Sequence, residues 1–259
     1  MKISIDKLCK LFNIDWRISV CYPMLEEKGL TYDSGYAEHI GLVYKINPLY
    51  GQVASSNIKV FDPKKAAAMY FWYEAADKTD KSILRYFPEY ERCIDNKHTE
   101  FNSNYGVFAQ SGLNLCIEAL LADKNSRQAC FMINNNDAMG PNSIDKLCTN
   151  AIMFFIRRDT LRMVIQMRSS NLLTLLPYDM FIFSTWYAKV YNALIKQYPN
   201  LGINSIIVQV ASIHFFESDF EEKADGEENN CKALFTYKDM CDSNFKNVLE
   251  EKLIEFLKQ

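Results

Sequence analysis

The chain has 259 residues, of which 49% are hydrophobic and 24% charged, the balance of an ordinary globular protein. A net charge of −3 without a basic stripe argues against a nucleic-acid-binding surface. Eight scattered cysteines without a CxxC pair, and three histidines far apart, argue against a zinc site. The longest stretch without Lys or Arg, 169–188, contains Asn, Pro and Asp, so we do not expect a membrane span.

The first part of the chain is expected to form a short helix at about residues 5–13. It is punctuated by polar residues and lacks a long apolar run, so we expect no signal peptide. A cytoplasmic protein with reduced thiols is the resulting expectation. Strand-like patterns follow at 40–46 and 56–61.

The middle of the chain alternates helices and strands irregularly. Asp62 as N-cap and Pro63 at the first position predict the start of a helix. A helix is predicted over 107–123, followed by strands over 128–134, 150–157 and 161–169, the last two joined by a tight turn at 157–160. A helix from Pro177 to about Gln197 and a strand over 203–216 come next. The chain then continues with an exposed acidic loop over 217–230 and a helix over 244–258. We therefore predict one α+β domain spanning residues 1–259, with a mixed or mostly antiparallel sheet flanked by helices.

Cys148 and Arg168 carry the first chemical hypothesis. Cys148 lies just before one strand of the expected hairpin, and Arg168 lies twenty positions later at the end of the other strand. A hairpin can bring the two together, and a guanidinium group near a thiol favours the nucleophilic thiolate. By itself, this spacing is also compatible with a small buried cysteine that only packs in the core.

Four segments in order extend this pattern: "FNSNYG" (101–106), "NSRQA" (125–129), "CTNAIMFFIRRDTLRMVIQMRS" followed by "LLPYD" (148–179), and "ASIHFF" (211–216). Together they resemble the thymidylate synthase superfamily, and within it the phage-type deoxycytidylate hydroxymethylases. The resemblance covers about residues 101–216, is weak in the first sixty residues and is absent after Phe220. It implies a thymidylate synthase-like fold in a homodimer whose sheets pack back to back.

The resemblance also implies an activity. A Cys thiolate adds to C6 of a pyrimidine nucleotide, and C5 then takes up a one-carbon unit from 5,10-methylenetetrahydrofolate. Hydroxymethylases finish the reaction with water, so the expected function is a nucleotide C5 hydroxymethyltransferase acting on dCMP or CMP, whose role in phages is DNA modification. No direct binding of nucleic acid or membrane is expected.

The resemblance assigns roles to individual residues. Cys148 would be the nucleophile, and Tyr105 would belong to the hydrogen-bond network around C5. Arg168 and Ser169 would hold the phosphate, while Arg127 would reach the phosphate in the site of the partner subunit. His214 would lie near the sugar, and Asn171 takes the place of an aspartate that contacts the folate.

Asp179 is the position that distinguishes bases within the family. Uracil-binding members have Asn there, whereas cytosine offers the reverse pattern, an acceptor at N3 and a donor at the 4-amino group. A protonated carboxyl matches cytosine, although Asp179 could also be only a favourable helix-start residue. The apolar run between Ser169 and Asp179 is expected to be a strand beneath the pocket.

The chain departs from the family at its proton-transfer position. The family's glutamate lies three residues before a tryptophan, and Met69 stands three residues before Trp72 here. Met cannot transfer a proton, and Glu74 and Asp62 are the carboxylates that could serve in its place. Losing a positioned acid or base costs roughly a hundred- to ten-thousand-fold in rate.

Further departures are Gln128 at a second phosphate arginine, Asn171 at the folate aspartate and Phe216 at the sugar tyrosine. Two alternatives therefore stay open: a catalytically impaired nucleotide-binding homologue, and a dUMP-directed thymidylate synthase or hydroxymethylase.

Overall fold

The structure, a computed structural model, describes residues 31–33, 36–49, 61–134, 139–216, 219 and 233–258. The strands are β1 (Thr31–Asp33), β2 (Tyr36–Ile46), β3 (Cys130–Met132), β4 (Thr149–Arg157), β5 (Thr160–Asn171) and β6 (Gly202–Phe216). The helices are α2 (Pro63–Ala75), α3 (Gly106–Ala122), α5 (Leu176–Leu194), α6 (Tyr237–Cys241) and α7 (Phe245–Lys258), with 3-10 helices η1 (Ser82–Arg85) and η2 (Pro88–Cys93).

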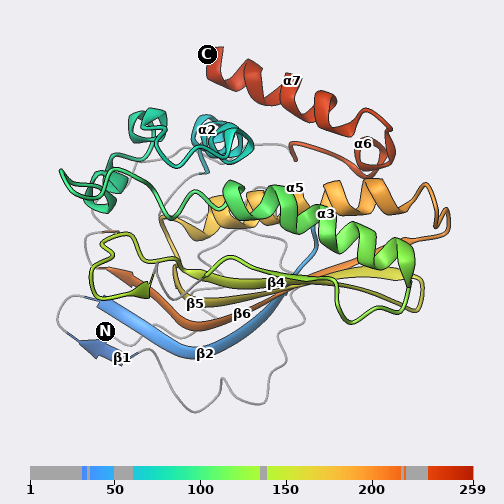
Figure 1. The fold of residues 1–259 in the computed structure, drawn as a ribbon, viewed down its shortest axis with the longest axis horizontal. Helices are drawn as coiled ribbons and strands as arrows, with labels where there is room; N and C mark the ends of the chain where they lie inside the picture. Colours follow the sequence, from blue (N-terminus) through green and yellow to red (C-terminus); the bar gives the residue numbers. More distant parts are fainter. Residues whose placement is uncertain are drawn as a thin grey trace, which may run out of the picture.

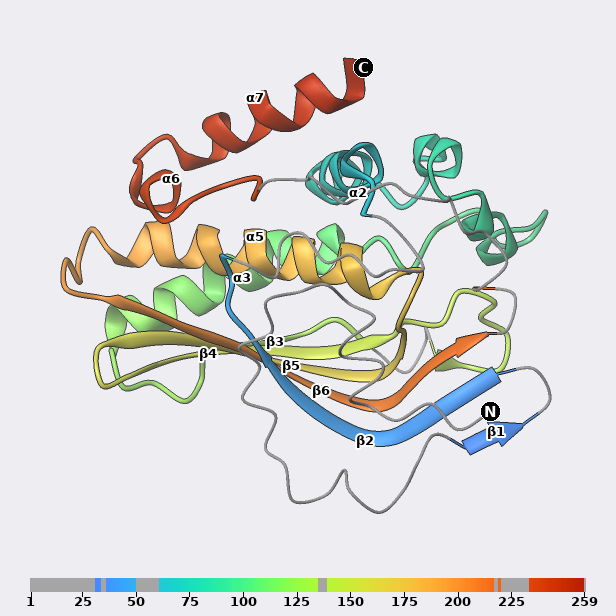
Figure 2. The same cartoon turned by 180° about the vertical axis from the view of Figure 1, so that it is seen from behind.

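The six strands form one sheet in the order β1-β2-β6-β5-β4-β3. All neighbouring pairs are antiparallel except β5 and β6, which run parallel because α5 carries the chain back between them. The helices of the described residues lie on one side of the sheet (Figures 1 and 2). The prediction of an α+β chain with a mixed sheet flanked by helices is therefore confirmed.

The helices form two layers over the sheet. α3 and α5 lie directly on it, and α2 and α7 lie farther out (Figure 1). α5 is buried along almost its whole length because it is covered by strands on one side and helices on the other. α7, an outer helix, buries only Phe245, Leu249 and Leu253.

Local sequence signals explain several element boundaries. The Asp62 side chain accepts a hydrogen bond from Lys64 N at 2.8 Å, which makes it the predicted N-cap of α2. Arg158 and Asp159 have φ of 52° and 54°, as a two-residue hairpin turn requires. The predicted hairpin of β4 and β5 is thus confirmed.

The other predicted elements agree with the structure within a few residues wherever they are described. The predictions over 40–46, 107–123, 128–134, 203–216 and 244–258 correspond to β2, α3, β3, β6 and α7, and the helix expected to reach Gln197 ends at Leu194. The helix expected at 5–13 lies outside the described residues. The strand expected at 56–61 also lies outside them, except for Phe61, which is not in a strand. Of the acidic loop expected at 217–230, only Asp219 is described.

The strand expected between Ser169 and Asp179 is wrong. β5 ends at Asn171, whose side-chain oxygen accepts hydrogen bonds from Leu173 N at 3.0 Å and Thr174 N at 2.9 Å. These bonds turn the chain, as an Asn side chain does in an Asx turn. α5 then begins at Leu176, with Pro177 in its first turn.

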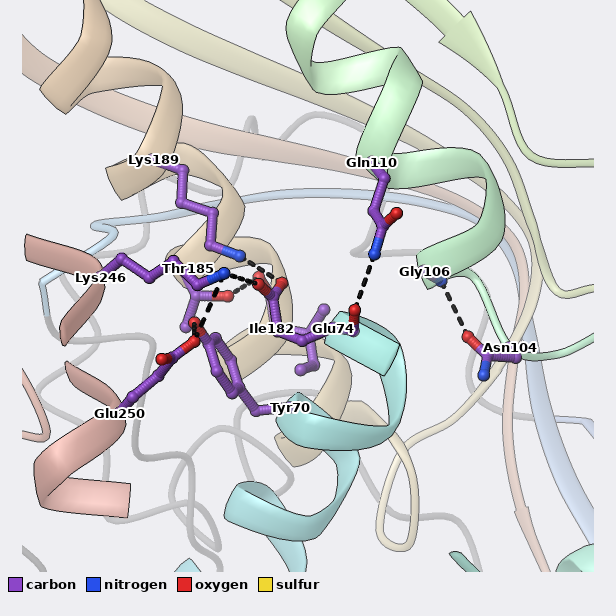
Figure 3. Close-up of polar contacts among 10 residues, drawn as sticks. All are labelled: Tyr70, Glu74, Asn104, Gly106, Gln110, Ile182, Thr185, Lys189, Lys246 and Glu250. Carbon is purple, nitrogen blue, oxygen red and sulfur yellow. Dashed lines mark hydrogen bonds and ion pairs between the residues drawn. The ribbon is translucent and has the colours of Figure 1, made fainter. Parts of the chain in front are cut away.

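An ion-pair network joins three helices (Figure 3). The Glu74 carboxylate on α2 pairs with Lys189 of α5 and, at 3.1 Å, with Lys246 of α7. Glu250 of α7 pairs with Lys246 at 3.6 Å and accepts a hydrogen bond from the Tyr70 hydroxyl at 3.3 Å. Burial alone would raise the pKa of Glu74, but the two ammonium groups outweigh burial and hold the pKa of this carboxyl below its usual range.

Among the helices that the structure describes, none combines the length and apolar character needed to cross a membrane.

Replacing Glu74 by Gln should destabilise the protein because it leaves the mostly buried Lys189 without its carboxylate. We expect the free energy of unfolding at pH 7 to fall by about 2–3 kcal/mol, between the values for exposed and fully buried pairs. Since the pKa of Glu74 is lowered on folding, this stabilisation is present above its unfolded pKa and lost as the pH falls through its folded pKa. Urea unfolding at pH 7 and pH 3 measures both effects.

The exposed Glu255→Gln on α7 is the matched control and should leave the stability within about 0.5 kcal/mol of the wild type. Equal stabilities for Glu74→Gln and Glu255→Gln at pH 7 would contradict the role of the network.

Candidate functional site

A cavity of about 660 Å³ opens where β5 and β6 end and α5 begins. Its size falls within the range of small-molecule sites. All the predicted site residues except Arg127 line it: Tyr105, Cys148, Arg168, Ser169, Asn171, Asp179 and His214. Residues far apart in the sequence are thus brought together around one cavity.

The segment 101–106 holds the loop that carries Cys148. Asp145 in that loop is buried, and its carboxylate accepts hydrogen bonds from Ser103 N at 2.7 Å and Ser103 Oγ at 2.9 Å. The Asn102 amide donates to the Asp145 carbonyl at 3.2 Å. Hydrogen bonds to a charged group are among the stronger ones, so the loop is fixed against the segment.

Tyr105 fixes the backbone of the candidate nucleophile directly. Its hydroxyl oxygen accepts hydrogen bonds from Cys148 N at 3.1 Å and Thr149 N at 3.3 Å. A phenol oxygen has two acceptor positions and one proton, so the proton stays available to a ligand in the cavity. Burial, with Cys148 and Asp179 nearby, raises the pKa of Tyr105 and keeps it protonated.

The position of Tyr105 is set by the contact between α2 and α3. The buried Asn104 amide donates to the carbonyls of Trp72 and Asp77, both at 3.1 Å. Its oxygen accepts from Gly106 N at 3.1 Å (Figure 3). A Cβ at Gly106 would lie 1.8 Å from the Tyr73 carbonyl oxygen, so only glycine permits this approach. The "FNSNYG" segment therefore joins two helices and the Cys148 loop.

Arg168 is directed at the Cys148 sulfur. Its Nε donates to the Leu147 carbonyl at 2.7 Å and its Nη2 to the Lys146 carbonyl at 2.9 Å. The same Nη2 lies 3.7 Å from Cys148 Sγ. The predicted pairing of Cys148 with Arg168 is present in the structure.

The thiolate expectation needs correction. Burial raises the pKa of Cys148 more than the Arg168 charge lowers it, and the carboxylates of Asp179 and Asp145 raise it further. The net pKa lies above the ordinary value, so the thiol form prevails in the free protein at neutral pH. The Arg168 charge lowers the pKa of Cys148 as expected, but burial raises that pKa by more.

Ser169 and His214 meet across the two parallel strands. Ser169 Oγ lies 3.3 Å from His214 Nδ1, and the imidazole packs against Phe216 with ring centroids 5.3 Å apart. Burial lowers the pKa of His214, and the nearby carboxylates of Glu38 and Asp219 raise it by less than burial lowers it. The imidazole is therefore neutral at pH 7.

Asp179 lies in the first turn of α5 and faces the cavity. Burial raises the pKa of its carboxyl to about 7. Among the described residues, no side chain donates a hydrogen bond to it. The carboxyl is thus close to half protonated at neutral pH and can both donate and accept.

Asn171 lines the cavity, but its polar atoms are largely engaged. Its oxygen forms the turn after β5, and its Nδ2 donates to Asp219 at 3.0 Å. The residue that offers a carboxylate next to it is Asp219. This residue was missed because it lies within the acidic stretch that was expected to be a solvated loop.

Arg127 does not reach this cavity within its own chain. It is exposed and lines a separate recess with Ser126 and Gln128. Its expected role in the site of a partner subunit stays a prediction.

The two candidate substitutes for the family glutamate are engaged away from the cavity. Met69 is buried in the core, Glu74 belongs to the ion-pair network, and Asp62 caps α2. None of the three lines the cavity, because α2 directs these side chains elsewhere. Of the residues that the structure describes, the carboxylates that line it belong to Glu89, Asp145, Asp179 and Asp219. Asp145 could have been noticed from its place three residues before Cys148.

No protein-family model matches the chain, and no curated protein matches it significantly. The function must therefore be argued from the cavity.

The reactivity of Cys148 should respond in opposite directions to its two charged neighbours. Arg168→Gln removes the cation beside Sγ and should slow alkylation by iodoacetamide at pH 8 by roughly tenfold. Asp179→Asn removes a charge that raises the thiol pKa and should accelerate it. Peptide-level mass spectrometry separates Cys148 from the other cysteines, and Arg158→Gln in the exposed turn is the control. Equal rates for all variants would overturn this view of the thiol.

Asp179 should make stability depend on pH. Its carboxyl titrates near 7 when folded and near 4 when unfolded, so its contribution is intact below pH 4 and lost as the pH rises to about 7. The loss amounts to at most roughly 4 kcal/mol, by linkage. Urea unfolding should show Asp179→Asn gaining stability over the wild type between pH 5 and pH 8, whereas the exposed Glu251→Gln should follow the wild type. A constant difference across this range would refute the raised pKa.

Proposed function

We propose that this protein binds a pyrimidine nucleoside monophosphate, with cytosine preferred over uracil, and transfers a one-carbon unit to C5 as a hydroxymethyltransferase of the thymidylate synthase type. The observation that carries the proposal is the Cys148 sulfur, 3.7 Å from the Arg168 guanidinium in a cavity shared with Asp179. Nucleophile, cation and base-reading carboxyl thus surround one space.

In this proposal Arg168 and Ser169 hold the phosphate. The guanidinium is held by two backbone carbonyls, which leaves part of its donor fork to contact an anion. Arg127 of the partner subunit would complete the grip in a homodimer with the sheets back to back. Support for this arrangement is the helix-free side of the sheet among the described elements, and the distance of Arg127 from its own cavity.

Asp179 reads the base. A carboxyl with a pKa of about 7 is substantially protonated at neutral pH, so its O–H donates to N3 of cytosine while its other oxygen accepts from the 4-amino group. Uracil presents the reverse order, N3–H and O4, and would require the proton on the other carboxyl oxygen. The preference for cytosine therefore rests on the resemblance, in which uracil-binding members have Asn at this position. A base that the carboxyl does not match leaves a buried group unpaired, which costs roughly 1–3 kcal/mol.

Cys148 carries the covalent step. Its thiol would lose its proton to water as the sulfur bonds to C6, and the electron pair of the C5–C6 double bond moves to C5. C5 would then bond to the methylene group of 5,10-methylenetetrahydrofolate. After C5 loses its proton, tetrahydrofolate would leave with the electron pair of its N–CH2 bond. Water would add to the methylene group as the sulfur leaves C6, which restores the C5–C6 double bond. The Tyr105 hydroxyl, which accepts two backbone hydrogen bonds and keeps its own proton, would hold the water that takes the C5 proton.

The cavity residues fit this cosubstrate in part. Lys65 of α2 and Arg92 of η2 line the cavity and would hold its carboxylates, whereas the Asn171 oxygen is already engaged. The proposal places the protein in the cytoplasm, where a thiol such as Cys148 stays reduced.

A second candidate is a nucleotide-binding homologue without one-carbon chemistry. Two observations favour it: Met69 is buried in the core where the family has its glutamate, and the pKa of Cys148 is raised. This candidate keeps the phosphate and base contacts and loses the C5 reaction.

Release of the C5 hydrogen distinguishes the two candidates. With tritium at C5 of CMP or dCMP and with the folate present, the hydroxymethyltransferase should release label into water, and Cys148→Ser should abolish this release. Asp179→Asn should shift the preference toward uracil nucleotides by roughly tenfold.

Thermal shift provides the second arm of this experiment. Ligand at a hundred times its dissociation constant adds about 2.7 kcal/mol of stability. Stabilisation by the nucleotide without any label release identifies the binding homologue. Indifference to every pyrimidine nucleotide contradicts both candidates.

A further inference from the structure

Polar side chains form a strip along the ends of β5 and β6. Asn171 and His214 are register partners, and Ser169 pairs with Ser212 on the neighbouring strand. Asp219 follows the end of β6 and joins the strip through Asn171. Ser169, Asn171, His214 and Asp219 all line the 660 Å³ cavity.

The Asp219 carboxylate is fixed through one oxygen only. Its Oδ2 accepts hydrogen bonds from Asn171 Nδ2 at 3.0 Å and from Phe216 N at 2.8 Å. Within the described residues, Oδ1 has no hydrogen-bond partner. An oxygen with two acceptor positions is therefore left for a ligand in the cavity.

The surroundings of Asp219 favour neutral donors over a phosphate. The nearest titratable ring, His214, is neutral because burial lowers its pKa, and no ammonium or guanidinium group of the described residues pairs with Asp219. A carboxylate without a cation repels a phosphate and accepts hydrogen bonds from hydroxyl or amino groups.

The strip lies beside the proposed phosphate subsite. Ser169 follows Arg168 in the chain and contacts His214 at 3.3 Å, so the strip begins where the phosphate contacts end. In a nucleoside monophosphate the sugar is bonded directly to the phosphate. The groups next to Arg168 and Ser169 therefore face the sugar, while Asp179 faces the base.

We propose that Asp219 is the sugar-reading residue of this cavity and that it selects a ribonucleotide, CMP, over dCMP. The inference rests on the proposed nucleotide-binding function. Ribose presents adjacent 2′- and 3′-hydroxyls, and both can donate to the free Asp219 oxygen. Deoxyribose lacks the 2′-hydroxyl and satisfies only one of the two acceptor positions, so it forms one hydrogen bond fewer.

The test compares the dissociation constants of CMP and dCMP by calorimetry with wild-type protein, Asp219→Asn and Glu89→Gln. Glu89 lines the same cavity from η2 and provides a matched carboxylate control. We expect the wild type and Glu89→Gln to bind CMP at least tenfold more tightly than dCMP, and Asp219→Asn to bind the two within about threefold.

Three outcomes would overturn the sugar assignment and leave the proposed function standing. They are equal affinity of the wild type for the two nucleotides, tighter binding of dCMP, and an unchanged ratio in Asp219→Asn. Failure of the wild type to bind either nucleotide overturns both proposals. The wild-type ratio alone tests the preference for ribose even if Asp219→Asn does not fold.

Discussion

The hydrogen bonds from the backbone amides of Cys148 and Thr149 to the Tyr105 hydroxyl are the interaction on which the site depends. They join the residue before α3 to Cys148 and to the first residue of β4, the strand that pairs with β5. Arg168 reaches the sulfur only because β4 and β5 are paired in register with Cys148 at their open end. The Tyr105 phenol therefore fixes the backbone that carries the Cys148 thiol.

The pKa values of the groups in the cavity are shifted mainly by burial and less by neighbouring charges. Burial raises the pKa of Cys148 and of Asp179, and it lowers the pKa of His214. All three groups are driven toward their neutral forms. The cavity is thus lined by a thiol, a half-protonated acid and a neutral imidazole, with the Arg168 guanidinium beside the thiol. Such a site suits a ligand that brings its own anion and a polar, uncharged ring.

Much of the fold could be predicted because its boundaries carry strong local signals. Asp62 with Pro63 starts α2, and the residues at 157–160 form the hairpin turn. The run after Asn171 was misjudged because its apolar residues suit a strand as well as a buried helix start. The deciding contact is a side-chain bond from Asn171 to the following backbone, which a hydrophobic pattern does not contain.

The residues around the cavity were predictable only where a motif marked them. Asp219 and Asp145 owe their positions to tertiary contacts with Asn171 and Ser103. Glu74 looked like a candidate acid from its place on α2, but its carboxylate meets the lysines of two other helices instead. Sequence spacing shows the order of side chains along a helix, but it does not show which residues of other elements those side chains contact.

Helix α5 connects the cavity at Asp179 with the ion-pair network at Lys189. Asp179 lies in its first turn and Lys189 lies ten residues later, about 15 Å along the same rigid helix. The helix that carries the Asp179 carboxyl is therefore also the helix to which α7 is connected through Glu74. Helix α7 therefore helps, through Glu74 and Lys189, to hold the helix that carries the Asp179 carboxyl.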